Sequence, residues 1–192
     1  MTIWPALLLL AFGLIEPVVQ PASSSDPWFQ RSAKRGDFRP APLPWKTFNV
    51  DLPKDWDLVR GFGTTLLTAT DKPRNNQPMG AIVIEHTALA APLGPADVNA
   101  FLAGLELKLA MQRDPSGRNF EQQAKEVDKQ RFVFIQYSRD GFGPERVVIY
   151  SFPTGNVMYR LICIAPEMQM HEKYREIFAH VASSFRPATS AK

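Results

Sequence analysis

The sequence predicts an α+β domain in which a mainly antiparallel sheet lies between helices. Short apolar runs separated by turns come before and after one helical stretch, and consecutive strands joined this way pair antiparallel. The run 157–165 is almost uninterruptedly apolar, as expected of a strand covered on both faces. Beyond Pro166, apolar residues recur at helical spacing and form one stripe: Met170, Tyr174, Ile177, Phe178, Val181 and Phe185.

The first residues of the 192-residue chain have the pattern of an export signal. Residues 3–15 are apolar and uncharged, but they are fewer than the roughly 20 needed to span a bilayer. Small residues at Ala22 and Ser24 suit a signal peptidase. We therefore expect a signal peptide at 1–22, with an uncleaved anchor as the alternative. The other expected parts are a Pro/Ser-rich basic linker at 23–44, the domain at 45–187 and a disordered tail at 188–192.

The charge distribution excludes nucleic acid as a partner. The chain carries a net charge of +3, and the linker 23–44 and the much longer segment 45–192 each carry +2. A domain so close to neutral has no basic surface for a phosphate backbone. The basic linker could make weak contact with anionic lipid if the leader stays attached. We favour a solvated linker, and a mature chain without a transmembrane span.

The first half of the domain is expected to hold four strands. Each strand is a short run rich in β-branched or aromatic residues, bounded by Gly, Pro or Asp. The polar segment 71–78, with two prolines, is expected to be a long loop. The expected strands are residues 45–52, 56–60, 64–70 and 81–87.

A helix is expected to follow, starting at Gly94-Pro95 and ending at Asp114-Pro115. Its predicted buried stripe is Val98, Phe101, Leu102, Leu105 and Leu109. Residues 120–129 fit either an exposed edge strand or a weak helix. Residues 130–137 read as a clear strand, and 146–152 should form a hairpin with 157–165, before the closing helix.

Two segments resemble a known family. The stretch from Phe48 to Trp56, Phe-Asn-Val-Asp-Leu-Pro-Lys-Asp-Trp, resembles the F-x-V-x-x-P-x-x-W opening of the PsbP/Mog-type fold. Residues 159–161, followed by a helix that closes on 183–186, are similar to the family's ending. The resemblance implies an α/β/α sandwich that binds proteins more often than it catalyses reactions. With an export signal, it implies the bacterial exported branch and a secreted or periplasmic location.

The titratable residues give no catalytic constellation. His171 and His180 are nine positions apart on one helix, so they point to opposite faces, and we expect both to be solvated. His86 shares a strand face with Ile82 and Ile84, where a hydrogen-bonded structural role is favoured over a metal or catalytic one. Cys163, in the most apolar run, is expected to be a small buried hydrophobe.

Arg160 is the one charged residue in that apolar run. Buried, it would need a carboxylate partner; near the strand end it could reach solvent, which is the interpretation we favour. The sequence contains no G-x-S-x-G, P-loop or H-E-x-x-H motif. We therefore predict a protein that is not an enzyme and that needs no cofactor or metal.

The best binding candidate is the loop 138–145, with Arg139, Asp140 and Phe142 as its site residues. Exposed aromatic and arginine side chains are typical interface anchors, although Phe142 could instead fold back onto the core. The predicted function is an exported, non-catalytic protein-binding or assembly module of the cell envelope, with a partner of unknown identity. The alternative is a small-molecule or lipid carrier with a pocket between the sheet and the helix 98–109. A third hypothesis is a hydrolase using Cys163 or His86.

Overall fold

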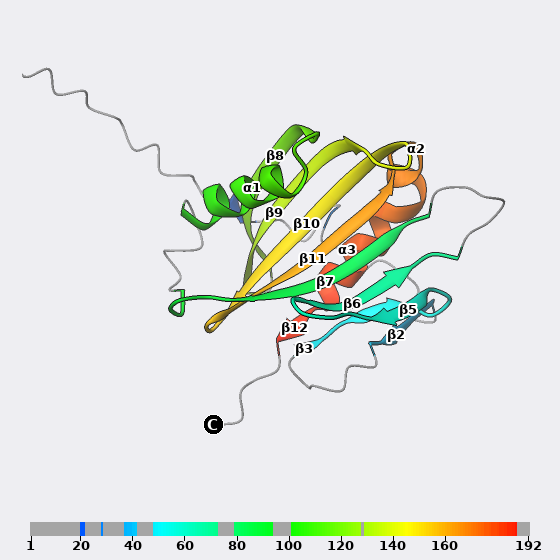
Figure 1. Cartoon of the computed structure of the whole chain (residues 1–192). Helices are drawn as coiled ribbons and strands as arrows, with labels where there is room; N and C mark the ends of the chain where they lie inside the picture. The colour runs from blue at the N-terminus through cyan, green and yellow to red at the C-terminus, as the bar shows by residue number, and fades with distance from the viewer. Residues whose placement is uncertain are drawn as a thin grey trace, which may run out of the picture.

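The computed structural model describes residues 20–21, 28, 37–41, 48–72, 79–93, 101–127 and 129–187. They form an eight-stranded sheet with the strand order β1-β8-β9-β10-β11-β7-β6-β5 (Figure 1). The pairs are antiparallel, except that β1 runs parallel to β8. The strands are β1 (Gln20–Pro21), β5 (Asp57–Arg60), β6 (Thr65–Thr70), β7 (Ala81–Ala88), β8 (Arg118–Val127), β9 (Gln130–Asp140), β10 (Pro144–Thr154) and β11 (Val157–Pro166).

Two short strand pairs lie beside this sheet. β2 (Phe38–Pro40) pairs with β4 (Asp51–Pro53), and β3 (Phe48–Asn49) pairs with β12 (Arg186–Pro187). β2 falls within the range predicted to be a linker, and its Phe38 is buried against the ring of His180. Residues 37–41 are therefore part of the folded domain. The apolar run 3–15, most of the linker and the tail 188–192 lie outside the described residues.

β11 lies in the interior of the sheet, as its apolar sequence predicts. It pairs with β10 on one side and with β7 on the other, so that Cys163 lies opposite both Val148 and Ile82. The ambiguous segment 120–129 proves to be mostly strand, because β8 pairs with β9 along most of its length.

The closing helical segment packs on one face of the sheet. It consists of α2 (Glu167–Gln169), a π-helical turn η2 (Met170–Tyr174) and α3 (Arg175–Ser184). The predicted apolar stripe is confirmed, since five of its members are buried and Ile177 is partly buried. His180 was expected to be solvated and is instead buried, because β2 and β4 cover that side of the helix.

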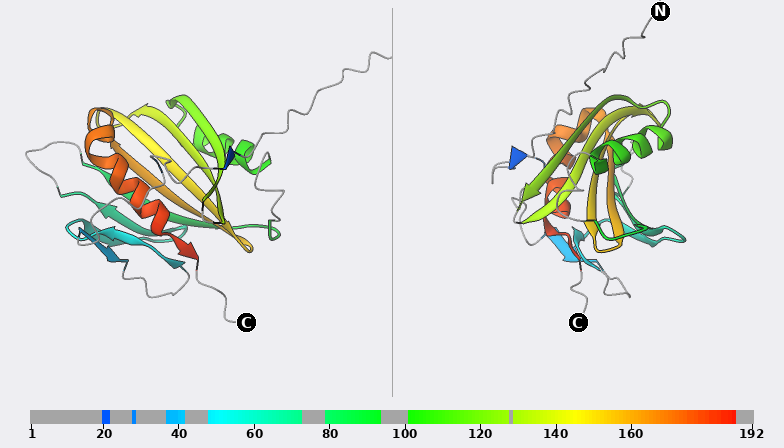
Figure 2. Two further views of the ribbon diagram at one scale, coloured as in Figure 1. Left: turned by 180° about the vertical axis from the view of Figure 1, so that it is seen from behind. Right: turned by 90° about the vertical axis from the view of Figure 1, so that its left-hand side faces the viewer.

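α1 (Phe101–Arg113) packs on the opposite face (Figure 2). The predicted buried stripe is wrong in part: Leu105 and Leu109 are each 39% exposed. The row that faces the sheet is Leu102, Glu106 and Ala110, three residues one turn apart, and each of them is buried.

The fold is therefore a mainly antiparallel sheet, with a small number of helices beside it among the described residues. One helical segment lies on each face, as predicted, but the sheet makes up more of the described chain than a sheet sandwiched between helices implies. No helix in the described ranges is both long and apolar enough to cross a bilayer.

Candidate binding site at the β9–β10 turn

The candidate loop 138–145 is a tight turn between two long strands. β9 continues to Asp140 and β10 begins at Pro144, so only residues 141–143 connect them. The Gly141 N–H donates to the Gly143 carbonyl at 2.9 Å, and Gly143 has a φ of 140°, a conformation that favours glycine. Phe142 at the tip is 98% exposed. The alternative that Phe142 folds back onto the core is thus wrong.

Glu145 supports the turn through hydrogen bonds. Its carboxylate accepts hydrogen bonds from the Phe142 N–H at 3.4 Å and from Arg139 Nε at 2.8 Å. A Cβ atom added to Gly141 would come within 2.5 Å of the Glu145 carboxylate, so a larger residue there would displace that carboxylate. The tip of the hairpin is therefore tied to a buried carboxylate.

Arg139 belongs to this support and not to the exposed tip. Besides Glu145, its guanidinium donates to Asp114 Oδ1 at 2.9 Å, and Asp114 also accepts from the Tyr137 hydroxyl. Burial lowers the pKa of Arg139, but the hydrogen bonds to Glu145 and Asp114 outweigh it and raise the pKa. Burial and Asp114 both raise the pKa of Tyr137. Arg139 therefore supports the turn through Glu145 and Asp114, and its predicted role as a direct contact residue stays a prediction.

Asp140 lies on the surface next to Phe142. Its carboxylate accepts two hydrogen bonds from Arg118, at 2.7 and 3.0 Å, and the hydrogen bond from Arg118 lowers the pKa of Asp140. Both side chains are exposed. The accessible part of the site is therefore an aromatic ring beside a charged pair.

Met168 is a second exposed apolar residue at this end of the sheet. It is 92% exposed on α2, which lies beside the β9–β10 turn in Figure 1. Glu145 pairs with Pro166, and Glu167 accepts from Ser138 Oγ at 2.9 Å, so the start of α2 is fastened to the hairpin. The sequence analysis did not single out Met168. Its position outside the predicted apolar stripe of the closing helix was a signal that its side chain is exposed.

Phe62 provides an internal comparison. It lies in Gly61-Phe62-Gly63, the same three-residue sequence as Gly141-Phe142-Gly143, and it is also 98% exposed. It connects β5 to β6, at the opposite end of the sheet from the β9–β10 turn. The two turns are held differently, because at this one the Gly61 N–H donates to the Leu66 carbonyl at 3.0 Å.

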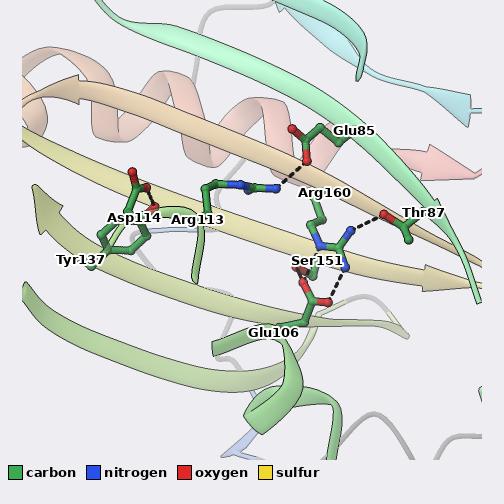
Figure 3. A network of polar contacts seen from close by, with 8 residues as sticks. All are labelled: Glu85, Thr87, Glu106, Arg113, Asp114, Tyr137, Ser151 and Arg160. Carbon is green, nitrogen blue, oxygen red and sulfur yellow. Dashed lines mark hydrogen bonds and ion pairs between the residues drawn. The ribbon is translucent and has the colours of Figure 1, made fainter. Parts of the chain in front are cut away.

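A buried polar network lies between α1 and the sheet (Figure 3). Arg160 donates to both oxygens of Glu106 at 2.6 Å and to Thr87 Oγ1 at 2.8 Å. Ser151 Oγ also donates to Glu106, at 2.7 Å. The expectation that Arg160 reaches solvent is thus wrong, because α1 covers it and supplies the carboxylate. These side chains fill space where the carrier hypothesis placed its pocket.

Cys163 and His86 do not converge. Cys163 is buried, and burial raises the pKa of its thiol. It lies opposite Ile82, whereas His86 lies opposite Tyr159, four positions away along β11. The buried Nδ1 of His86 has no hydrogen-bond partner among the described residues, contrary to the expected hydrogen-bonded role. Within the described ranges, no group of three His, Cys, Asp or Glu side chains is placed to hold a metal ion.

Comparison with known proteins identifies the fold. The sequence matches no protein-family model and no curated protein. The structure is similar to cyanobacterial PsbP (CyanoP) from Synechocystis sp. PCC 6803, with a TM-score of 0.60 and 13% identity over 81% of this chain and 95% of that one. It is also similar to Mycobacterium tuberculosis LpqN, described as involved in cell envelope biogenesis (TM-score 0.53, 14% identity, 79% and 91% covered).

A point mutant of Mog1 is similar as well, with a TM-score of 0.53 and 8% identity over 80% of this chain and 97% of that one. The chain therefore has the PsbP/Mog-like fold that the Phe48–Trp56 segment and the C-terminal strand and helix implied. At these identities the likeness shows the fold alone.

Proposed function

We propose that this chain is an exported, non-catalytic binding or assembly module of the bacterial cell envelope, and that it binds a protein partner at the β9–β10 turn. The fold it shares with CyanoP and LpqN supports the proposal, since LpqN is described as involved in cell envelope biogenesis. The buried state of Cys163 removes one candidate nucleophile. The export signal predicted at 1–22 supports a secreted or periplasmic location.

The observation that carries the proposal is the exposure of Phe142 on a fixed turn. Burying a phenylalanine side chain in a partner's pocket contributes about 1.5–3 kcal/mol. A turn that is already held by Glu145 loses little conformational entropy on binding, so more of this contribution remains as affinity. Arg118 and Asp140 supply the polar rim that surrounds such anchors in interfaces.

Photo-crosslinking in the producing cell tests the proposal. A photoreactive phenylalanine analogue replaces Phe142 in one variant and Phe62 in a second, which serves as the control because both positions are equally exposed on Gly-Phe-Gly turns. We expect a discrete protein adduct from position 142 that position 62 does not give, with mass spectrometry identifying the partner. Adducts of equal yield and identity from the two positions, or none from 142, would reject the site.

A further inference from the structure

Two large apolar side chains, Phe142 and Met168, protrude from the same end of the sheet. They are 98% and 92% exposed. Phe142 lies on the β9–β10 turn, and Met168 lies on α2, which directly follows β11 and begins beside that turn (Figure 1). A single exposed apolar side chain is common on a protein surface, whereas neighbouring ones mark a contact surface. We therefore ask what kind of partner would cover both.

The main chain holds these two side chains at a fixed spacing. Glu145 on β10 pairs with the last residue of β11, and its carboxylate also accepts from the Phe142 N–H at 3.4 Å. Ser138 Oγ on β9 donates to the carboxylate of Glu167, the first residue of α2, at 2.9 Å. The turn and the start of α2 are thus fastened to the same strands. A partner that accepts both side chains would have little main chain to order on this side of the interface.

The charged side chains around the two apolar residues already have partners within the domain. Arg118 donates two hydrogen bonds to Asp140, and Arg139 donates to two carboxylates. Arg146 and Glu167 meet at one serine hydroxyl, to which Arg146 donates at 3.2 Å and from which Glu167 accepts at 2.9 Å. A charged group on a partner would have to compete with these contacts, and exposed ion pairs contribute little in any case. The apolar side chains are therefore the part of this surface that gains most from being covered.

We propose that Phe142 and Met168 enter one uncharged, apolar cleft of a single protein partner, an inference that rests on the function proposed above. The centres of protein interfaces are enriched in aromatic residues and methionine and depleted of charge. The unbranched methionine side chain adapts to an irregular pocket, and the rigid phenylalanine ring fills a defined one. Salt screens interactions between charges and leaves apolar contacts largely unaffected. Binding at this cleft should therefore be insensitive to salt.

Photo-crosslinking from position 168 tests the inference. The purified full chain, with a photoreactive amino acid in place of Met168, is added to an envelope extract of the producing cell at a concentration below saturation, so that adduct yield follows affinity. We expect the same protein adduct as from position 142, identified by mass spectrometry. Phe142→Ala should lower the yield at 168 by at least about fivefold, because one of the two anchors is lost. Phe62→Ala, the matched control, should leave that yield unchanged. Raising NaCl from about 50 mM to about 500 mM should change it by less than about twofold.

The outcomes separate this inference from the function on which it rests. No protein adduct from position 142 would reject both. An adduct from 142 that 168 does not share, or a yield at 168 that Phe142→Ala leaves unchanged, would overturn the shared cleft while the proposed function stands. A larger loss of yield at high salt would overturn the uncharged character of the cleft. Crosslinks from 168 to lipid or to a second copy of the chain would overturn the choice of partner. Both side chains are exposed, so the variants should keep the melting temperature of the unchanged chain.

Discussion

Glu106 of α1 and Arg160 of β11 form a doubly hydrogen-bonded ion pair in which both N–O distances are 2.6 Å, enclosed between the helix and the sheet. The pair lies 54 residues apart in sequence and joins α1 to the central strand. It also explains why α1 presents a charged residue in the middle of its buried row.

Removing one member of this pair should destabilise the fold strongly. Glu106→Ala leaves the guanidinium of Arg160 buried without its carboxylate, which typically costs about 3–5 kcal/mol of unfolding free energy. The double variant Glu106→Leu/Arg160→Met should recover most of that loss, because apolar residues of similar volume replace both charges. Urea unfolding of Glu106→Leu, Arg160→Met and the double variant measures the coupling as a double-mutant cycle. Additive effects of the single substitutions would contradict the assigned coupling.

The orientation of α1 predicts opposite outcomes for two leucines three positions apart. Leu102→Ala should lower the unfolding free energy by about 2–5 kcal/mol, because its side chain is buried against the sheet. Leu105→Ala should cost less than about 1 kcal/mol, since that side chain is partly solvated and alanine favours the helix. Thermal and urea unfolding of the two variants provide the comparison. A larger loss for Leu105→Ala would mean that α1 is rotated about its axis.

Asp71 should contribute stability that disappears in acid. Burial raises its pKa, but hydrogen bonds from Lys173 and Tyr174 outweigh burial and place the pKa below its ordinary value. Because the folded state then binds the proton less readily than the unfolded state, this contribution is present above the unfolded pKa of about 3.9. It is lost as the pH falls through the lower folded value.

The unfolding free energy measured from pH 7 to pH 2 tests this sign. In Asp71→Asn the acid-dependent part should be smaller than in the unchanged chain, and the stability at pH 7 should be lower. Tyr174→Phe removes one of the two donors and should give an intermediate acid dependence. An acid profile of Asp71→Asn identical in shape to that of the unchanged chain would contradict the assignment.

Two glycines should respond to alanine in opposite directions. A Cβ at Gly80 would overlap the ring of Tyr174, whose hydroxyl accepts from the Gly80 N–H at 3.1 Å. Gly80→Ala should therefore cost about 1–3 kcal/mol through overpacking. Gly104, on the exposed side of α1, would place its Cβ in open space within the described part of the chain. Gly104→Ala should raise the unfolding free energy by up to about 1 kcal/mol, because alanine favours the helix. If the melting temperatures of the two variants shifted in the same direction, the packing described at one of the two positions would be contradicted.

The sequence predicts best those elements whose apolar pattern has a single solution. Two examples are confirmed by the structure. β11 is a nearly continuous apolar run, and the closing helix has a single apolar stripe through Met170, Tyr174 and Phe178. α1 is different, because leucines at 102, 105, 107 and 109 surround the helix and leave its rotation undetermined. The partner of Arg160 decides that rotation, and no local pattern connects Glu106 to a strand 54 residues away.

The candidate site was predictable in position but not in roles. Glycines beside Phe142 indicate a turn with an exposed aromatic, and the structure has one. The role of Arg139 depends on Glu145 and Asp114. The pairing of β9 with β10 places Glu145 opposite Arg139, and the end of α1 brings Asp114 to the same place. The contacts of Phe38 with His180 and of Trp28 with Phe134 could not be predicted either. Both aromatic residues lie in a proline-rich, charged stretch whose composition is typical of a linker.

The affinity of the purified chain for the partner captured at position 142 is the most direct test of the account. Phe142→Ala should weaken binding by about 10- to 30-fold, the equivalent of about 1.4–2 kcal/mol. The melting temperature should not change, since the ring touches solvent on all sides. Phe62→Ala should leave both the affinity and the stability unchanged. Equal affinities of Phe142→Ala and Phe62→Ala for that partner would contradict the proposed role of the β9–β10 turn.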